Sequence, residues 1–504
     1  MDKIAPVSID RPEVSESFES GESIQEILSR PRKTGKVLLI VPFQSDVYGI
    51  KIKPAYPALG ILSVAAMLEK AGHRVSLIDA DADNISIEGI LEMISEDKYG
   101  VVGFTAVTST YPSAVKIASS IKKDFPCVVT VLGGIHATVD SVNCAKEKAF
   151  DFVVVGEGEC TAVELVDSIM DGIDNFSQIK GVVYRNREGD IISGGRRGLV
   201  SNLDDLPFSA WHLIGGLKRY APADATFLPA APIMVSRGCP GQCTYCNTKN
   251  IFGRRLRFRS AINAVEEIRM LVYKYNVKEI HFLDDVITAN RKFVFDLCGL
   301  LKNEPYKLHL EVSNGLRADM VDKEILAALK EVGLKNVGFG IETGNDRISK
   351  LIKKGITKDQ VRHAISIAKD LGLETWGFFI IALPGDDRES IMDTINFAIE
   401  LDPKFAKFLI LKPFPGTEAY AQLEKKGLIM SRDFSQYGVY TPPVHRLETL
   451  SQEEILKLQR MAFKRFYFRP AKIFEHIKDI RSVGKIISVI RGFIFIVVRV
   501  FSKG

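Results

Sequence analysis

The sequence predicts an α/β protein: an N-terminal doubly wound, Rossmann-like domain, then a partial (β/α)6 barrel, then a C-terminal helical tail. Two separate series of apolar segments alternate with amphipathic helical stretches, over residues 36–175 and 231–420. A chain of 504 residues is also too long for one ordinary core, so several folding units are expected. Three of the seven cysteines fall within eight residues near the start of the second series, where they indicate a metal site.

Residues 1–35 are expected to form a flexible N-terminal arm. They contain many Ser, Glu, Asp and Pro residues and no apolar segment, which is typical of neither a signal peptide nor a membrane span. Over the whole chain, 46% hydrophobic and 26% charged residues are typical of a globular protein with a large core. The few, irregularly placed cysteines argue against a secreted disulfide scaffold and favour a reducing cytoplasm.

Five short apolar segments predict a parallel sheet in residues 36–175, since strands covered by helices on both faces are apolar throughout. These segments are 36–42, 74–81, 99–107, 127–134 and 150–158. Doubly wound sheets bind ligands at the carboxyl ends of their strands, and glycines gather at two of those ends, at 133–134 and 156–158. A hairpin-like segment at 182–193 and an irregular stretch after it predict an interdomain connection over 176–230.

Six further strand segments predict the partial barrel in residues 231–420, with its active face at the carboxyl ends of the strands. They are 232–238, 278–285, 308–315, 336–344, 375–385 and 404–417. Helical stretches separate them, as in a series of β/α units.

The loop after the first barrel strand carries a CxxxCxxC motif, formed by Cys239, Cys243 and Cys246. Thiolates are the ligands of iron–sulfur clusters, and three of them leave one iron of a four-iron cubane open for chemistry. A zinc site is the alternative, and it would need a fourth ligand. The nearest downstream candidates, His281 and Cys298, lack the paired spacing of a zinc ribbon.

This motif, with Tyr245 before its last cysteine, resembles the signature of the radical S-adenosylmethionine (SAM) superfamily. The resemblance implies that the open iron of a [4Fe–4S] cluster chelates SAM and that one electron cleaves SAM to a 5′-deoxyadenosyl radical. It also implies SAM contacts at later strand ends. The residues at those ends are Asp284 and Asp285 for the SAM ammonium, and Asn314, Arg317 and Glu342 for its carboxylate or ribose.

Residues 36–175 resemble the cobalamin-binding domain of one subclass of these enzymes, through PALGILSVAAMLEKAGHRVSLID, FTAVTST, GGIHAT, VVVGEGE and the connector LDDLPFSAW (203–211). The resemblance implies that the corrin and its nucleotide tail are lined by Thr105, Thr108, Gly133, Gly134, His136, Gly156 and Glu157. The loop after the first strand contains no histidine, so no histidine ligand to cobalt is expected. His73 is expected at the surface. A Rossmann-like domain without a corrin is the alternative.

Residues 421–504 predict a helical, basic and apolar C-terminal region, which begins with a capping-box pattern at Ser451 and Glu454. Because the basic residues concentrate there, the net charge of +5 is no argument for nucleic-acid binding by the body. The apolar segment 484–501 is interrupted by Arg491 and Arg499 and is too short to span a bilayer. A helix packed on the barrel and a peripheral membrane contact both fit this segment.

The pattern is most similar to class B radical SAM methyltransferases, with hopanoid methylases and anaerobic magnesium-protoporphyrin monomethyl ester cyclases as kin. It implies methylation of an unactivated carbon, with lipids, isoprenoids and tetrapyrroles as candidate substrates and flavodoxin or ferredoxin as electron donor. An oxidative cyclase or C–C bond-forming enzyme is one alternative, and a non-catalytic iron–sulfur sensor or scaffold is another. We expect a cytoplasmic protein, with the tail as its contact to the inner face of the membrane.

Overall fold

The predicted parallel sheet forms the centre of the first domain, in a computed structural model that describes residues 23–48, 53–223 and 225–478. Its strands lie in the order β2-β1-β3-β4-β5. They span Lys36–Val41 (β1), Arg74–Asp79 (β2), Val101–Thr105 (β3), Val129–Gly133 (β4) and Phe152–Val154 (β5), and all of these pair in parallel. This is the doubly wound topology that the five apolar segments predict.

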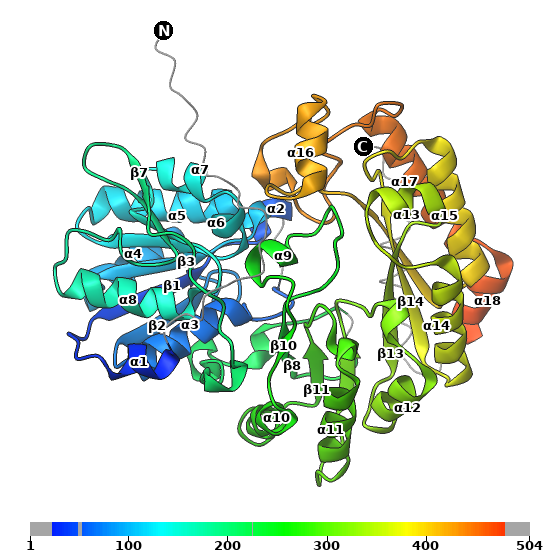
Figure 1. Cartoon of the computed structure of the whole chain (residues 1–504), viewed down its shortest axis with the longest axis horizontal. Coiled ribbons are helices and arrows are strands. Elements are labelled where there is room, and N and C mark those ends of the chain that lie inside the picture. The colour runs from blue at the N-terminus through cyan, green and yellow to red at the C-terminus, as the bar shows by residue number, and fades with distance from the viewer. Residues whose placement is uncertain (1–22, 49–52, 224, 479–504) are drawn as a thin grey trace.

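Helices cover both faces of this sheet (Figure 1). One face carries α1 (Ile24–Ser29), α3 (Leu59–Lys70) and α8 (Gly158–Met170), whose buried residues share one core with the sheet. The other face carries α4 (Ile87–Asp97), α5 (Tyr111–Asp124), α6 (Ile135–Val139) and α7 (Ser141–Lys146) with a second core. The short helix α2 (Ser45–Tyr48) follows β1.

The segment predicted to connect the two domains begins instead as part of the first sheet. Strands β6 (Val182–Arg185) and β7 (Ile191–Ser193) form the expected hairpin, but β6 pairs antiparallel with β5 and extends the sheet to seven strands. The first domain therefore reaches past its predicted end at residue 175. Only the stretch after β7 connects it to the barrel.

Part of the predicted N-terminal arm is folded. In α1 the side chains of Ile24 and Ile27 are buried in the core that α3 and α8 share with the sheet. Ser23 caps this helix, and Arg30 forms an ion pair with Glu164 of α8. Two isoleucines three positions apart are enough to dock one helical turn, a signal too short to stand out in a polar sequence. Residues 1–22 lie outside the described part of the chain.

All six predicted barrel strands are present, in two parallel sheets of three strands. The first contains β8 (Ala230–Ile233), β11 (Glu279–Phe282) and β12 (His309–Val312), and the second contains β13 (Asn336–Glu342), β14 (Glu374–Ile381) and β15 (Phe405–Ile410). Single bridges join the sheets, between Leu310 and Leu334 and between Leu316 and Phe339. A small antiparallel pair, β9 (Ser236–Arg237) and β10 (Arg257–Phe258), flanks the cysteine loop.

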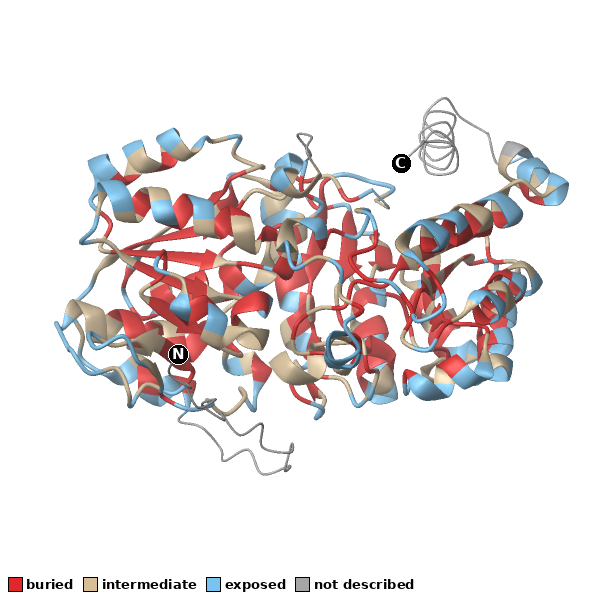
Figure 2. Cartoon of the chain, turned by 90° about the horizontal axis from the view of Figure 1, so that it is seen from above, coloured by how far each residue is buried: buried red, intermediate tan, exposed pale blue. Residues whose placement is uncertain are grey.

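The barrel helices shield these sheets from solvent. They are α10 (Ala261–Tyr275), α11 (Arg291–Lys302), α12 (Lys323–Glu331), α13 (Asp346–Leu351), α14 (Lys358–Asp370) and α15 (Arg388–Leu401). The short helix α9 (Thr248–Ile251), after the cysteine loop, contacts α6 of the first domain instead. Figure 2 shows the buried strands between helices whose outer faces are exposed. The resulting core joins the barrel strands to the inner faces of the longer helices.

The C-terminal region continues as α16 (Glu418–Lys425), α17 (Gln452–Tyr467) and α18 (Pro470–Lys478). The capping box predicted at Ser451 and Glu454 is present, and α17 packs against β15 and α15. Within residues 23–48, 53–223 and 225–478, no helix is long and apolar enough to cross a bilayer. The apolar segment 484–501 lies outside the described residues, so its membrane contact stays a prediction.

Candidate metal centre and interdomain cavity

The CxxxCxxC loop leaves the barrel at the carboxyl end of β8, directly after β9. Gly238 begins it at φ +95°, and a Cβ there would lie 2.3 Å from the Arg255 carbonyl oxygen, so only glycine fits this turn. The three thiols are unpaired and partly exposed. A Cβ at Gly241 would lie 3.3 Å from Cys239 Sγ and 3.9 Å from Cys243 Sγ, so these two sulfur atoms flank the same glycine.

Two of the thiols also share an electrostatic environment. Burial raises the pKa of the Cys239 and Cys246 thiols, and the carboxylate of Asp285 adds to both shifts. The Cys246 thiol lies 3.2 Å from Thr248 Oγ1, at the start of α9. The Cys239 and Cys246 thiols thus both lie near the Asp285 carboxylate.

A four-iron cluster and a zinc ion require different distances between the sulfur atoms that bind them. Among the residues that the structure describes, no three His, Cys, Asp or Glu side chains lie close enough to hold one metal ion. Zinc would require four ligands at about 2.0–2.3 Å from a single centre. In a cubane each thiolate binds a different iron, so the sulfur atoms lie farther apart.

Neither candidate for a fourth zinc ligand is available to the cysteine loop. The His281 Nε2 atom lies 2.7 Å from Glu279 Oε1, and its Nδ1 atom lies 2.6 Å from the Tyr56 hydroxyl. Cys298 is buried on α11 in the barrel core. Both side chains are therefore committed elsewhere.

The first of the two aspartates after β11 lies beneath the cysteine loop. The Asp284 side chain is 1% exposed and accepts hydrogen bonds from the Val235 amide (3.0 Å) and the Ser236 hydroxyl (2.6 Å). It holds the backbone that leads into the loop. These bonds use only Oδ1, and Oδ2 is buried without a hydrogen-bond partner in the described residues, so the contact of Asp284 with the SAM ammonium stays a prediction.

The second aspartate, Asp285, lies near the Cys239 and Cys246 thiols. It is half-buried, and its Oδ1 lies 3.3 Å from the hydroxyl of Thr248, the same group that contacts Cys246. Burial raises its pKa to about 6. Consecutive strand-end residues point to different sides, and the order Asp-Asp alone does not reveal which of them faces the site.

Replacing Asp284 with asparagine is expected to remove a pH dependence of stability. Burial raises the pKa of Asp284 to about 7, above its ordinary value of 3.8. The folded state therefore binds this proton more tightly, and the stability that it contributes falls as pH rises from about 4 to 7. Between pH 5 and 7, we expect the Asn variant to gain about 2 kcal/mol in unfolding free energy relative to wild type. Urea unfolding of the cluster-free proteins measures this, and parallel pH profiles would contradict it.

Arg317 and Asn314 follow β12, as predicted. Arg317 is held by Asp319 at 2.9 Å, and one of its guanidinium nitrogens lies 3.4 Å from the Cβ position of Gly241. It is therefore close to the cysteine loop. Asn314 is exposed and donates to the Leu283 carbonyl oxygen at 2.7 Å, so it braces the ends of β11 and β12 rather than the site.

Glu342 ends β13 in the left-handed region, at φ 69°, with its side chain buried. It forms an ion pair of 2.7 Å with the buried Lys354. The sequence analysis missed this lysine, because the polar segment Lys353-Lys354-Gly355 is typical of an exposed turn. Burial lowers the pKa of Lys354, but the Glu342 carboxylate and the Cys243 thiol raise it above its ordinary value. Tyr245 lies beside Cys243 and Glu342, and burial raises its pKa well above its ordinary value.

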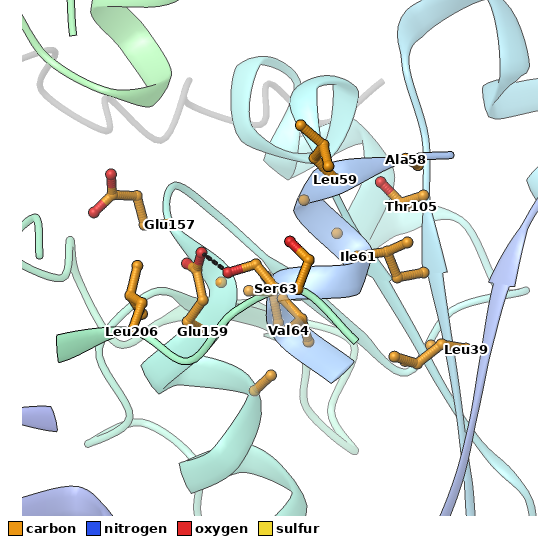
Figure 3. A pocket seen from close by; sticks show the side chains of 18 of the residues that line it. Leu39, Ala58, Leu59, Ile61, Ser63, Val64, Thr105, Glu157, Glu159 and Leu206 are labelled. Carbon is orange, nitrogen blue, oxygen red and sulfur yellow. Dashed lines mark hydrogen bonds between the residues drawn. The ribbon is translucent and has the colours of Figure 1, made fainter. Parts of the chain in front are cut away.

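A cavity of about 560 Å³ lies between the first sheet and the barrel. It extends between the sheet and helices α3 and α8, and it reaches the connector and the end of β8. Figure 3 shows Leu39, Ile61 and Thr105 on its wall and the 2.8 Å hydrogen bond from Ser63 to Glu159. Apolar side chains supply most of the wall.

Five of the seven residues predicted for the corrin and its tail line this cavity: Thr105, Gly133, Gly134, Gly156 and Glu157. A Cβ at Gly156 would meet no atom within 4 Å, so this glycine faces open space. At Gly134, with φ +94°, a Cβ would lie 2.8 Å from Thr105 Oγ1. Glycine is therefore required where β4 turns into α6.

Thr108 and His136 are not part of the cavity wall. His136 is fully buried in the other core of the first domain, with its ring 4.3 Å from that of Tyr111 and 4.8 Å from that of Phe434. Its Nδ1 lies 3.3 Å from Thr108 Oγ1, and burial lowers its pKa to about 4. Both residues lie outside the lining of the cavity, and their contact with the corrin stays a prediction.

His73 is also placed differently from the prediction. It is 4% exposed, accepts a hydrogen bond from the Gly35 amide at 3.2 Å and pairs with Asp167 at 3.0 Å. A histidine in the turn before a strand can join the chain entering the sheet to a helix above it. The sequence offers no sign of this pairing, because the partners are distant in the chain.

Buried ion pairs connect the cavity to the cysteine loop. Glu157 binds Arg257 through two hydrogen bonds, of 2.8 and 3.0 Å, and Glu159 binds Arg237 at 2.6 Å. Arg237 also lies 3.3 Å from Glu157 and stands two residues before Cys239. The sequence analysis missed Glu159, Arg237 and Arg257, which form no recognisable motif. They tie the position of the loop to the cavity wall.

Two family models match the chain. Residues 233–398 match the radical SAM superfamily, and residues 45–166 match the B12 binding domain. The first range contains the cysteine loop and most of the barrel. The second contains most of the first sheet and the cavity wall.

Relatives match the chain across both domains. A protein of Pyrococcus horikoshii, named as an uncharacterized methyltransferase, is 34% identical over 449 residues, which are 88% of this chain and 96% of that protein. The anaerobic magnesium-protoporphyrin IX monomethyl ester cyclase of Rubrivivax gelatinosus is 26% identical over 428 residues, 84% of this chain and 76% of that protein.

A solved structure shares the whole fold. The cobalamin-dependent S-adenosylmethionine radical enzyme OxsB, with aqua-cobalamin and S-adenosylmethionine bound, superimposes with a TM-score of 0.70. The match covers 92% of this chain and 72% of that chain, at 14% sequence identity. At this identity the likeness concerns the fold, in which a sheet domain, a barrel and a helical end follow one another.

Proposed function

The chain belongs to the B12-binding radical SAM enzymes, and from this premise we propose that it methylates an unactivated carbon of a small organic substrate. The family implies a [4Fe–4S] cluster, SAM and cobalamin as cofactors. One observation supports the proposal above all: the lining of the interdomain cavity includes Arg237, two residues before the first cysteine of the loop. A methyl donor in the cavity would adjoin the place where SAM is cleaved.

The residues of the loop suit the cluster. The thiols of Cys239, Cys243 and Cys246 would hold three irons. SAM would bind beside them, near Asp285 and Arg317. A carboxylate suits the SAM ammonium and a guanidinium suits its carboxylate. Asp284 would act beneath them as a positioning residue for the loop.

The cavity suits a corrin with a buried nucleotide tail. It combines an apolar slot between the sheet and α3 and α8 with glycines at the strand ends, where backbone can approach a large planar ligand closely. The described lining residues contain no histidine, and the absence of a histidine ligand to cobalt remains a prediction. The hydrogen bond from Ser63 to Glu159 places polar groups within the slot.

When bound, the cluster supplies the electron that cleaves SAM, and cobalamin carries the methyl group. The protein must then orient the substrate carbon and exclude water. Apolar walls from β1, α3 and α8 keep water from the cavity, and the buried pair of Glu342 and Lys354 closes the barrel side beside Tyr245. Arg237 forms ion pairs with Glu157 and Glu159, and these would fix the position of the cysteine loop relative to the cavity.

Product analysis without added substrate tests the proposal. The anaerobically reconstituted protein, with hydroxocobalamin, reductant and SAM, should form S-adenosylhomocysteine only when cobalamin is present and 5′-deoxyadenosine only when the cluster is present. An oxidative cyclase should form 5′-deoxyadenosine without S-adenosylhomocysteine, and a non-catalytic sensor should form neither. The cyclase remains the second candidate because three relatives, that of Rubrivivax gelatinosus among them, bear that name.

A further inference from the structure

Alternate residues of β14 and β15 face the inside of the barrel. Along both strands, half-buried positions alternate with buried ones. The buried Phe379 and Phe408 stack at 5.3 Å, and Phe408 contacts α17, which lies outside the sheet. Since neighbouring residues of a strand point to opposite faces, Trp376, Phe378 and Lys407 point inward. Figure 1 shows α14, α15 and α17 on the outer side of this sheet.

Phe378 forms an aromatic surface within the barrel. A Cβ at Gly338 of β13 would lie 2.7 Å from its Cζ atom, and a Cβ at Gly315 would lie 2.8 Å from its Cε2 atom. Any larger side chain at these two positions would displace the ring. The two glycines therefore leave room for Phe378 to lie across the inner face of β13, toward the end of β12.

The ammonium group of Lys407 lies over this surface. Its Nζ is 5.0 Å from the ring centroid of Trp376 and 5.1 Å from that of Phe378. It forms no ion pair and no hydrogen bond with any residue in the described part of the chain. By contrast, Lys404 on the same segment pairs with the carboxylate of Glu374.

Other buried lysines of the barrel also have partners. Lys354 binds Glu342 at 2.7 Å, and the Nζ of Lys412 donates to the carbonyl oxygens of Gln436 and Thr441, each at 3.1 Å. Lys407 differs from them: its Nζ lies over the rings of Trp376 and Phe378, and no described residue accepts a hydrogen bond from it or forms an ion pair with it. A half-buried cation without a counter-ion is unfavourable unless a ligand supplies a negative charge or a hydrogen-bond acceptor.

The opposite wall of the barrel carries a hydrogen-bond network. The Tyr56 hydroxyl, from the first domain, lies 2.6 Å from His281 Nδ1 and 3.1 Å from Ser313 Oγ. His281 Nε2 lies 2.7 Å from Glu279, whose carboxylate also accepts hydrogen bonds from the backbone amide of Thr226. The carboxylate of this wall is thus engaged with its own neighbours.

We propose that Lys407, with Trp376 and Phe378, binds an anionic group, either carboxylate or phosphate, on a flat or apolar substrate. This inference rests on the proposed methyl transfer, because it assigns the substrate of that reaction to the inside of the barrel. The anionic group of the substrate acts as the counter-ion of the Lys407 ammonium. The two aromatic rings pack against the apolar part of the same substrate. Of the candidate classes, tetrapyrrole carboxylates and isoprenoid phosphates satisfy this chemistry, and neutral lipids do not.

Matched aromatic probes test this assignment by binding alone. We would titrate naphthalene-2-carboxylate, 2-naphthyl phosphate and uncharged naphthalene-2-carboxamide into protein reconstituted with cluster and hydroxocobalamin, using calorimetry. Wild type should bind one or both anions about tenfold more tightly than the amide. Lys407→Met should bind all three equally, while Lys407→Arg should keep the preference. The stronger of the two anions identifies the group.

The control is Lys404→Met, which removes a lysine that already has a carboxylate partner and should leave the preference for anions intact. Equal binding of all probes by wild type, or an anion preference that survives in Lys407→Met, would overturn the assignment. Cobalamin-dependent S-adenosylhomocysteine formation, measured on wild type and on Lys404→Met, tests the proposed function separately. It should be the same in both proteins, because Lys404 lies outside the proposed binding site and no substrate takes part in that step.

Discussion

Replacing Cys239, Cys243 and Cys246 together with alanine is expected to abolish both the iron–sulfur absorbance and the cleavage of SAM to 5′-deoxyadenosine. Each thiolate would hold a different iron, so a cubane could not persist on this loop without them. The measurements are the visible absorbance of the reconstituted protein and chromatography of the nucleoside products. Both should fall to the level of protein that has not been reconstituted.

The other cysteines supply the control for this experiment. Cys144, Cys160 and Cys298 are buried in hydrophobic cores, where burial raises the pKa of each thiol, and Cys127 is exposed. Alanine variants of these four should keep the iron content of wild type. Loss of iron on changing one of them, or SAM cleavage by the triple variant, would show that the cluster has other ligands.

Replacing Ala162 with tryptophan is expected to abolish corrin binding while leaving the cluster in place. Ala162 lies on α8 and lines the cavity beside the sheet. An indole there would fill the slot in which a nucleotide tail would lie. Dissociation constants for hydroxocobalamin, measured by gel filtration or absorbance, should rise at least about tenfold, while iron content stays at the wild-type level.

The matched control is Ala421→Trp, which places the same side chain on the exposed surface of α16. It should bind hydroxocobalamin as wild type does. If Ala162→Trp binds the corrin normally, the cavity is not its site. If it loses iron as well, the substitution has disturbed the fold, and the smaller Ala162→Leu change, which narrows the same slot, becomes the deciding variant.

The strands and the cysteine loop could be predicted from the sequence because their signals are local. A strand covered on both faces is apolar along its whole length, as in the segment 36–42, and the three cysteines stand together in a Gly/Pro loop. Glycines at strand ends predicted the cavity wall at Gly133, Gly134 and Gly156. Each of these features depends on a few neighbouring residues.

The orientation of single side chains could not be predicted in this way. Asp284 and Asp285 follow the same strand, yet one lies beneath the cysteine loop on the Ser236 hydroxyl and the other faces the thiols. The partners of the buried His73 and Lys354 come from segments brought near by the fold, at Asp167 and Glu342. Spacing along the chain identifies the end of a strand, whereas packing decides which way a side chain turns.

The most direct test of the whole account is the count of iron, sulfide and corrin per chain after anaerobic purification with cobalamin supplied. A cubane and one corrin predict about four irons, about four sulfides and about one corrin per chain, with no zinc. Zinc in place of iron would contradict the cluster on the cysteine loop. Full iron and sulfide without any corrin would contradict the cobalamin site, and with it the proposed methyl transfer.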